Sequence, residues 1–299
     1  MRTLVVIATL AGLAALAGLA TLVALGLAIA PPAYAGEAAD TGEAPATPSK
    51  PTLDVVLTLA GGRTLECTVL EGTKDGTIKV KSPYGEQTFK RNEWVEARPK
   101  TPPAEFAIAK GLYNKRQFGK ASDKYQEIYD TYEHLYVLGA DALDGKGQAL
   151  MQLDKYKSAL AVYERLFQDY SGADITYLRR YFYAVCLSQV GGEKNFDEAV
   201  TQLEGVVAVT DDVITVRSLY QLGLIHNRNK KRLLALRAFM QVFILYRSYQ
   251  GDNQQEIQAL VERARKNAIA CCNALGKSSN TSIKRRVGKI KSALEHAGR

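Results

Sequence analysis

The chain has 299 residues, of which 46% are hydrophobic, 23% charged and 8% aromatic. This composition excludes a collagen-like, wholly disordered or disulfide-dense polypeptide. The formal net charge is +8, but seven basic residues lie between Lys277 and Arg299 against one acidic residue, Glu295. Most of the charge therefore belongs to a basic tail. This argues against a nucleic-acid-binding body, which would need basic residues over a broad face.

The first 35 residues predict an export signal or a membrane anchor. Residues 4–30 form an uncharged, apolar run of 27 residues behind Arg2. Ala33-Tyr34-Ala35 fits the cleavage site of a signal peptide, whereas the length of the apolar run suits a segment that spans the bilayer. We expect cleavage, and both alternatives place the remainder on the periplasmic or extracytoplasmic side of the membrane. Residues 36–52, rich in Ala, Pro, Thr and Glu, are expected to be a disordered linker.

Residues 53–98 predict a small β domain. Leu65, Cys67 and Val69 alternate with polar residues, as in a strand with one buried face, and Gly61-Gly62 and Asp75-Gly76 are typical of tight hairpin turns. Four or five strands this short are expected to curl into a barrel.

Residues 59–69 of this domain resemble the strand-turn-strand opening of SH3-like and Sm-like barrels in exported bacterial repeat proteins. RNA binding of the Sm type is not implied, because the family's RNA-contacting asparagine is absent after Asp75. Trp94 is expected in or just past the last strand, where it closes the core or joins the barrel to the next domain.

Beyond Pro103 the apolar period changes from 2 to 3.6, which predicts helices. Four segments come into register at spacings of 38, 40 and 36 residues when four alanines are aligned, namely Ala121, Ala159, Ala199 and Ala235. Twelve residues earlier, with an insertion allowed at 191–194, stand four further small residues: Ala109, Gly147, Ala184 and Gly223. Large residues recur four positions after the alanines (Tyr125, Tyr163, Leu203 and Phe239) and seven after them (Ile128, Leu166, Val206 and Val242). We interpret the small residues as the points where paired helices approach closely.

These spacings resemble the tetratricopeptide repeat (TPR) family, whose signatures appear as Leu222-Gly223-x-x-His226, Ala235-x-x-x-Phe239 and Phe118-x-x-Ala121-x-x-x-Tyr125. Residues 154–159 and 195–199 match the family's turn into its second helix. The resemblance implies a mainly α fold over residues 102–297, with about four helical hairpins. Residues 254–275 and 282–297 are expected to form a capping pair. The repeats are longer than usual, and Arg232 stands where an aromatic residue is common.

The same resemblance implies a concave groove lined by the first helix of each hairpin. The mapped positions are Phe106, Lys110, Tyr113, Asn114, Asp144, Gln148, Met151, Tyr181, Val185, Gln189, Arg217, Tyr220, Leu224 and Arg228. The expected contacts with a partner are Phe106, Lys110, Tyr113, Asn114, Gln148, Tyr181, Arg217, Tyr220 and Arg228, because rings with basic and amide groups suit an extended peptide or a helix. Alternatively, Tyr181 and Tyr220 pack between helices. The carboxylate clamp of chaperone-binding relatives is not reproduced, since Phe106, Gly145 and Phe182 occupy its positions.

Catalysis finds little support in the sequence. His134, His226 and His296 lie far apart without the spacing of a metal site, and neither a phosphate-binding loop nor a nucleophile elbow occurs. We expect His226 in the core, and no metal or cofactor. Cys67, Cys186, Cys271 and Cys272 are expected to be buried free thiols, with a bridge from Cys186 to Cys271 or Cys272 as the alternative.

The sequence therefore predicts a non-catalytic scaffold of the bacterial cell envelope that binds a peptide or helix of another envelope protein, and no nucleic acid. The alternative is surface attachment, in which Lys284, Arg285, Arg286, Lys289 and Lys291 hold anionic lipid or wall polymer. These charges would otherwise form only the solvated outer face of a capping helix. An enzyme is the third class, and a buried cluster of polar residues would be needed to favour it.

Overall fold

The computed structural model describes residues 50–170, 175–209 and 213–297. The predicted leader (1–35) and residues 36–49 of the predicted linker lie outside these described residues. Over the described ranges, the chain contains no helix with the length and apolarity needed to cross a bilayer.

The N-terminal part of the described chain is a five-stranded antiparallel sheet. Its strands are β1 (Leu53–Leu59), β2 (Thr64–Gly72), β3 (Ile78–Ser82), β4 (Gly85–Phe89) and β5 (Trp94–Pro99), and a 3-10 turn, η1 (Arg91–Glu93), precedes β5. The strand order is β4-β3-β2-β1-β5, so β4 and β5 form the edges of an open sheet. The expected closure into a barrel is therefore wrong. β4 explains why, because only Phe89 of this strand is even partly buried and it offers little apolar surface to a closing strand.

Trp94 holds the inner face of the sheet together. Its indole N–H donates a hydrogen bond of 3.0 Å to the carbonyl of Gly76, and the guanidinium of Arg91 lies 4.0 Å from the centre of its ring. The ring is buried beside the inward-facing side chains of β1 to β3, among them Val55 and Val69. The single tryptophan thus closes the core of the sheet.

Tyr136 joins the sheet to the helices. Its ring packs edge-on against Trp94, with 6.2 Å between ring centres, and packs at a tilt against Tyr170, with 4.9 Å between ring centres. Tyr136 has φ 62° and ψ −49°, and the N–H of Val137 donates to the carbonyl of Leu135. This γ-turn with positive φ is strained for a residue with a side chain, and the surrounding burial stabilises it.

The approach of the two parts at this junction needs a glycine. A Cβ at Gly72 would lie 2.7 Å from the Cβ of Tyr136 and 2.8 Å from the carbonyl oxygen of Leu135. Nearby, Lys74 donates to the buried carboxylate of Asp169 at 2.8 Å. Although burial favours the protonated acid, hydrogen bonds from Lys74 and Arg165 hold the pKa of Asp169 below its ordinary value. An ion pair therefore supports the aromatic contact.

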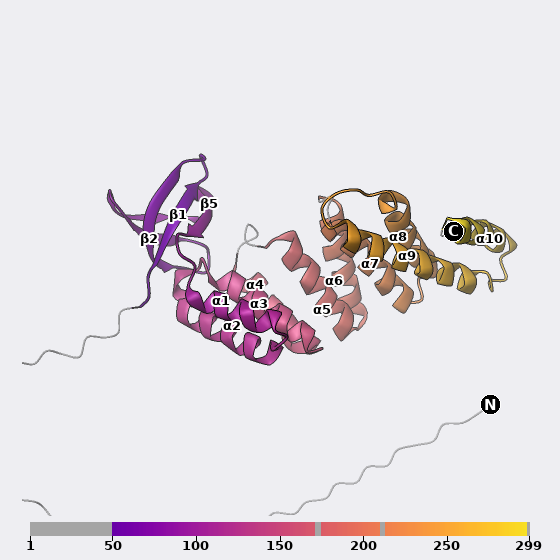
Figure 1. Ribbon diagram of the computed structural model, residues 1–299, viewed down its shortest axis with the longest axis horizontal. Coiled ribbons are helices and arrows are strands. Elements are labelled where there is room, and N and C mark those ends of the chain that lie inside the picture. Colours follow the sequence, from indigo (N-terminus) through magenta and orange to yellow (C-terminus); the bar gives the residue numbers. More distant parts are fainter. Residues whose placement is uncertain (1–49, 171–174, 210–212, 298–299) are drawn as a thin grey trace, which may run out of the picture. The chain divides into compact units, whose positions relative to one another are not determined.

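The rest of the described chain is helical (Figure 1). The helices are α1 (Ala104–Asn114), α2 (Phe118–Tyr132), α3 (Gly139–Gln152), α4 (Tyr156–Asp169), α5 (Tyr177–Val190), α6 (Glu193–Val207), α7 (Val213–Arg228), α8 (Arg232–Tyr246), α9 (Gln254–Leu275) and α10 (Thr281–His296), with a 3-10 turn, η2 (Glu133–Leu135), before α3. Each helix packs on the next, and across successive hairpins α5 also contacts α7 and α7 contacts α9. Consecutive hairpins stacked in this way form a TPR-like arrangement.

Three hairpins share one turn. Their middle residues are Arg116, Asp154 and Lys230, at φ 59°, 56° and 59°. The next N–H donates back to a carbonyl in the preceding helix at 2.9 to 3.0 Å, which satisfies acceptors that the helix end leaves open. The hairpin of α5 and α6 turns instead at Gly191 and Gly192, at φ 79° and 95°. The expected turn at 195–199 is therefore wrong, because the shorter glycine turn lets α6 begin at Glu193.

The recurring small residues lie at the seams between helices. All eight of them are buried: Ala109, Ala121, Gly147, Ala159, Ala184, Ala199, Gly223 and Ala235. A Cβ at Gly147 would lie 2.7 Å from the ring of Tyr163, and one at Gly223 would lie 2.4 Å from the ring of Phe239. Each ring therefore occupies the space that a side chain on the facing helix would need.

The four cysteines are buried free thiols. Burial raises the pKa of the Cys186 thiol to about 12, so the thiol is protonated at neutral pH. The thiols of the folded protein therefore act as small apolar side chains.

Gly223→Ala is expected to lower the free energy of unfolding by about 1–3 kcal/mol, because the buried ring of Phe239 has to move. The matched control is Gly288→Ala in α10, where no atom lies within 4 Å of the new Cβ. That variant is expected to gain up to about 1 kcal/mol from helix propensity. Urea unfolding of both variants measures the difference. Equal effects would contradict the close approach of α7 and α8.

Candidate protein-binding groove

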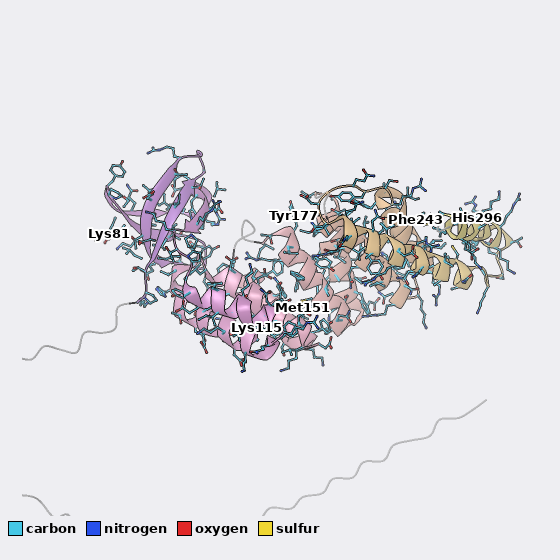
Figure 2. The ribbon with its side chains drawn as sticks, viewed as in Figure 1. Lys81, Lys115, Met151, Tyr177, Phe243 and His296 are labelled. Atoms are coloured by element: carbon cyan, nitrogen blue, oxygen red, sulfur yellow. The ribbon has the colours of Figure 1, made fainter. Side chains whose placement is uncertain are left out.

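The first helices of the hairpins supply the predicted groove residues. Five of the nine come together around a concave site of about 350 Å³ between α1 and α3, namely Phe106, Lys110, Tyr113, Asn114 and Gln148. Tyr125, Asp141, Asp144 and Gly145 complete its lining. Figure 2 labels Lys115, which follows α1, and Met151 in α3, the two helices that supply most of the lining.

Aromatic side chains form the apolar part of this site. Phe106 and Tyr125 pack edge to face with ring centres 6.4 Å apart, and Tyr113 packs in the same manner on Phe118 at 5.2 Å. A Cβ at Gly145 would lie 2.5 Å from the Tyr125 ring, so the glycine lets α2 approach α3. Burial raises the pKa of the Tyr113 phenol, which is therefore neutral at physiological pH.

Three polar side chains of the site have no partner within the part of the chain that the structure describes. Lys110, Asn114 and Gln148 line the concave site but make no hydrogen bond or ion pair with another described residue. Lys110 and Asn114 are exposed and Gln148 is partly buried. A cation and two amides are thus available beside aromatic surface, and amides can both donate to and accept from a peptide backbone.

Arg179 fixes the acidic wall of the site. This nearly buried side chain on α5 donates to the carboxylate of Asp141, and its Nε lies 3.6 Å from Oδ2 of Asp144, both on α3. The hydroxyl of Tyr163 also donates to Asp144 at 3.0 Å. Burial, and next the charge of Asp144, raise the pKa of Tyr163 well above its ordinary value, so the phenol keeps its proton and remains a donor. The two carboxylates are therefore held by their own chain.

The other four predicted contacts are engaged within the chain. Arg217 donates to Glu256 at 2.6 Å, the hydroxyl of Tyr220 accepts from Asn267 at 3.1 Å, and Arg228 donates to the carbonyl of Ser188. Tyr181 packs on Phe182 with ring centres 5.5 Å apart, and burial raises its pKa. Bonds to other helices thus hold Arg217, Tyr220 and Arg228, with two of the partners on α9, whereas Tyr181 packs on its neighbour in α5.

The remaining predicted residues lie apart from this site. Lys284, Arg285, Arg286 and Lys289 are exposed on α10, whereas Lys291 lies 3.6 Å from Glu295. His226 is partly buried beside α6 and α8, its Nδ1 has no partner among the described residues, and burial lowers its pKa. No group of three or more His, Cys, Asp or Glu side chains that could hold a metal ion occurs over the described ranges.

Sequence reasoning missed Arg179, Asp141 and Tyr125 as parts of this site. Asp141 stands one turn before Asp144 and would have been found by following the same helix face. Tyr125 was predicted only as a packing residue. Arg179 gives no local signal, since its role depends on α5 lying against α3.

The chain is similar to solved structures at low sequence identity. No family model and no curated protein matches the chain. Among solved structures, a MamA RS-1 double mutant is 16% identical, with 65% of this chain and 94% of that chain covered and a TM-score of 0.46. A TPR repeats protein from Bacteroides fragilis is also 16% identical, with 65% and 84% covered and a TM-score of 0.26. The description of the fold therefore rests on this chain's own helix pairs and turns.

Arg179→Ala is expected to lower the free energy of unfolding by about 2–3 kcal/mol, because it leaves the partly buried carboxylate of Asp144 without its cation. Arg179→Lys keeps the charge and is expected to cost less than half as much. Arg63→Ala, at an exposed position before β2, serves as the control. Chemical denaturation measures all three variants. A loss for Arg179→Ala no larger than that for Arg63→Ala would contradict the pairing of α3 with α5.

Proposed function

We propose that this protein is a non-catalytic scaffold that binds another protein in the concave site between α1 and α3. One observation carries the proposal. Lys110, Asn114 and Gln148 have no partner in the described chain and stand beside Phe106 and Tyr113, whereas nearby charged groups are paired. Polar groups left available next to exposed aromatic surface are a feature of binding sites.

The chemistry of the site favours a peptide segment with one apolar and one acidic side chain. The rings of Phe106 and Tyr113 would desolvate the apolar side chain, and Lys110 would pair with the acidic one. The amides of Asn114 and Gln148 would bind the peptide backbone. A cavity of about 350 Å³ is large enough for one or two side chains rather than for a whole helix.

We place this scaffold in the bacterial cell envelope. The argument is the uncharged run of residues 4–30 behind Arg2, followed by Ala33-Tyr34-Ala35. The partner would accordingly be another envelope protein.

Photo-crosslinking in intact cells tests the site directly. A photoreactive amino acid at Asn114 is expected to form a crosslink to a discrete partner, which mass spectrometry identifies. The matched control is the same amino acid at Lys120, another exposed position, on α2, that does not line the cavity. Crosslinking with equal yield from both positions would contradict the proposal.

Affinity measurements with the captured partner complete the test. The variant carrying Lys110→Glu, Asn114→Ala and Gln148→Ala is expected to bind at least tenfold more weakly, because three contacts are lost. These side chains make no hydrogen bond or ion pair with another described residue, so the unfolding transition of the variant is expected to stay nearly unchanged. An unaltered affinity would show that the partner binds elsewhere.

A second candidate function is attachment to an anionic surface through α10. The observation that favours it is the row of exposed basic residues on this helix, Lys284, Arg285, Arg286 and Lys289, none of which has an ion pair with another described residue. Val287 and Leu294 face the protein and are buried, so the charges project outward. Attraction of this kind is electrostatic and would hold the protein at acidic lipid head groups or wall polymer.

Salt separates the two functions. Binding through α10 to vesicles with acidic lipid is expected to fall steeply as ionic strength rises above about 0.1 M, where screening becomes short-ranged. Changing Lys284, Arg285, Arg286 and Lys289 to Gln together is expected to abolish this binding without affecting capture of a protein at the groove. Vesicle flotation at several salt concentrations measures the effect. Binding that persists at high salt would contradict attachment by charge.

A further inference from the structure

Helix α8 exposes an apolar surface on the side opposite to its packed face. Leu233, Leu234, Ile244 and Leu245 are 54%, 45%, 56% and 65% exposed, although each is a large aliphatic side chain. The buried face of the same helix, which includes Ala235, Phe239 and Val242, packs against α7 and α9. Figure 2 labels Phe243 on this helix. The described chain thus leaves an aliphatic face of α8 uncovered.

The composition of this face is unusual for a solvated helix. α8 contains no acidic residue, and its only charged residues are Arg232 and Arg237. At 3.6 residues per turn, the four exposed aliphatic residues together with Arg237 and Gln241 fall within about 120° of the helix surface. Clustered exposed apolar side chains with a few polar ones between them mark a surface that binds another protein. We call these six residues the α8 face.

The α8 face is symmetric along the chain about Phe239. Leu233 and Leu245 lie six positions to either side of it, Leu234 and Ile244 five, and Arg237 and Gln241 two. Apolar pairs therefore occupy both ends of the face, about 16 Å apart at 1.5 Å per residue, and a polar pair occupies its middle. The order of apolar and polar residues along this face is the same from either end of the helix. An antiparallel copy therefore brings apolar residues opposite apolar ones and polar residues opposite polar ones.

We propose that the α8 face binds a second copy of this chain, with the two α8 helices antiparallel across a two-fold axis. In this arrangement Leu233 and Leu234 of one copy meet Ile244 and Leu245 of the other at each end of the contact. Eight aliphatic side chains leave water, and every contact occurs twice, as an isologous interface requires.

Charge and shape agree with this occupant. At the centre, Arg237 of each copy comes opposite Gln241 of the other, whose side-chain carbonyl is an acceptor for the guanidinium. Neither side chain has a partner in the described chain. A hollow of about 290 Å³ borders the face, where Glu204 of α6 lies with Arg237 and Leu234. The carboxylate offsets the positive charges that the two-fold axis brings together.

The dimer would carry two concave sites, since α8 takes no part in lining the site between α1 and α3. The inference does not depend on the proposed function. Two sites in one assembly would raise the apparent affinity for a partner that presents two copies of its peptide.

The test uses protein expressed from the full sequence and purified in the form in which cells produce it. Sedimentation velocity measures its mass at protein concentrations between about 1 and 200 µM. The unaltered chain is expected to pass from one copy to two with rising concentration. One variant carries Leu233→Lys and Leu234→Lys, and a second carries Ile244→Glu and Leu245→Glu. Each variant alone is expected to associate at least tenfold more weakly, because charges face aliphatic residues at both ends of the contact.

An equimolar mixture of the two variants tests the antiparallel register. One end of the mixed dimer keeps its four aliphatic side chains, and the other end pairs two lysines with two glutamates, so association is expected to return. Ile108→Glu, at a position of α1 that is 53% exposed, is the control and should leave the mass unchanged. Circular dichroism checks that each variant is folded.

Several outcomes would overturn the inference. In the first, the unaltered chain stays monomeric over the whole concentration range, as would follow if residues 1–49, another protein or a membrane occupied the face. In the second, the variants associate as well as the unaltered chain. A mixture that fails to recover would likewise exclude the antiparallel pairing.

Discussion

The close approach of paired helices is the constraint on which the rest of this structure depends. A ring from the second helix of a hairpin lies where the first helix carries only a hydrogen atom, as with Phe239 above Gly223 and Tyr163 above Gly147. Rings that pack on backbone hold the two helices at a short distance and leave little freedom in their crossing angle. The first helices of successive hairpins then lie close to one another, and side chains of α1 and α3 line one concave site.

Backbone conformation repeats along with side-chain packing. Arg116, Asp154 and Lys230 adopt nearly the same left-handed conformation at the same point of three hairpins, although their side chains share no chemistry. For a residue other than glycine, this conformation is unfavourable by on the order of 1 kcal/mol. The hydrogen bond that each turn returns to its helix offsets this cost. The geometry of these three hairpins therefore depends on their turns as well as on the packing between their helices. The hairpin of α5 and α6 differs, because Gly191 and Gly192 form a shorter turn.

The charged side chains divide the groove into two parts. Towards α9, Arg217 and Arg228 are bonded to their own chain, and Asn267 donates to Tyr220. Between α1 and α3, the acidic residues are paired through Arg179, whereas Lys110, Asn114 and Gln148 keep their hydrogen-bonding capacity. The first part stabilises the stack, and the second is available to a ligand. The outer face of α8 differs from both parts, because its one charged residue, Arg237, lies among exposed aliphatic side chains and no helix of the described chain covers it.

The sequence by itself determined the periodic parts of this protein. Small residues twelve positions before an alanine and large ones four and seven after it are short-range regularities, and they predicted helical hairpins with buried seams. Alternation likewise predicted the strands. Only the tertiary structure decided whether the sheet closes, which groove residues are already engaged, and that Arg179 of α5 pairs with two carboxylates of α3. The reason is that closure and ion pairing depend on residues far apart in the chain, whose distance no local pattern records.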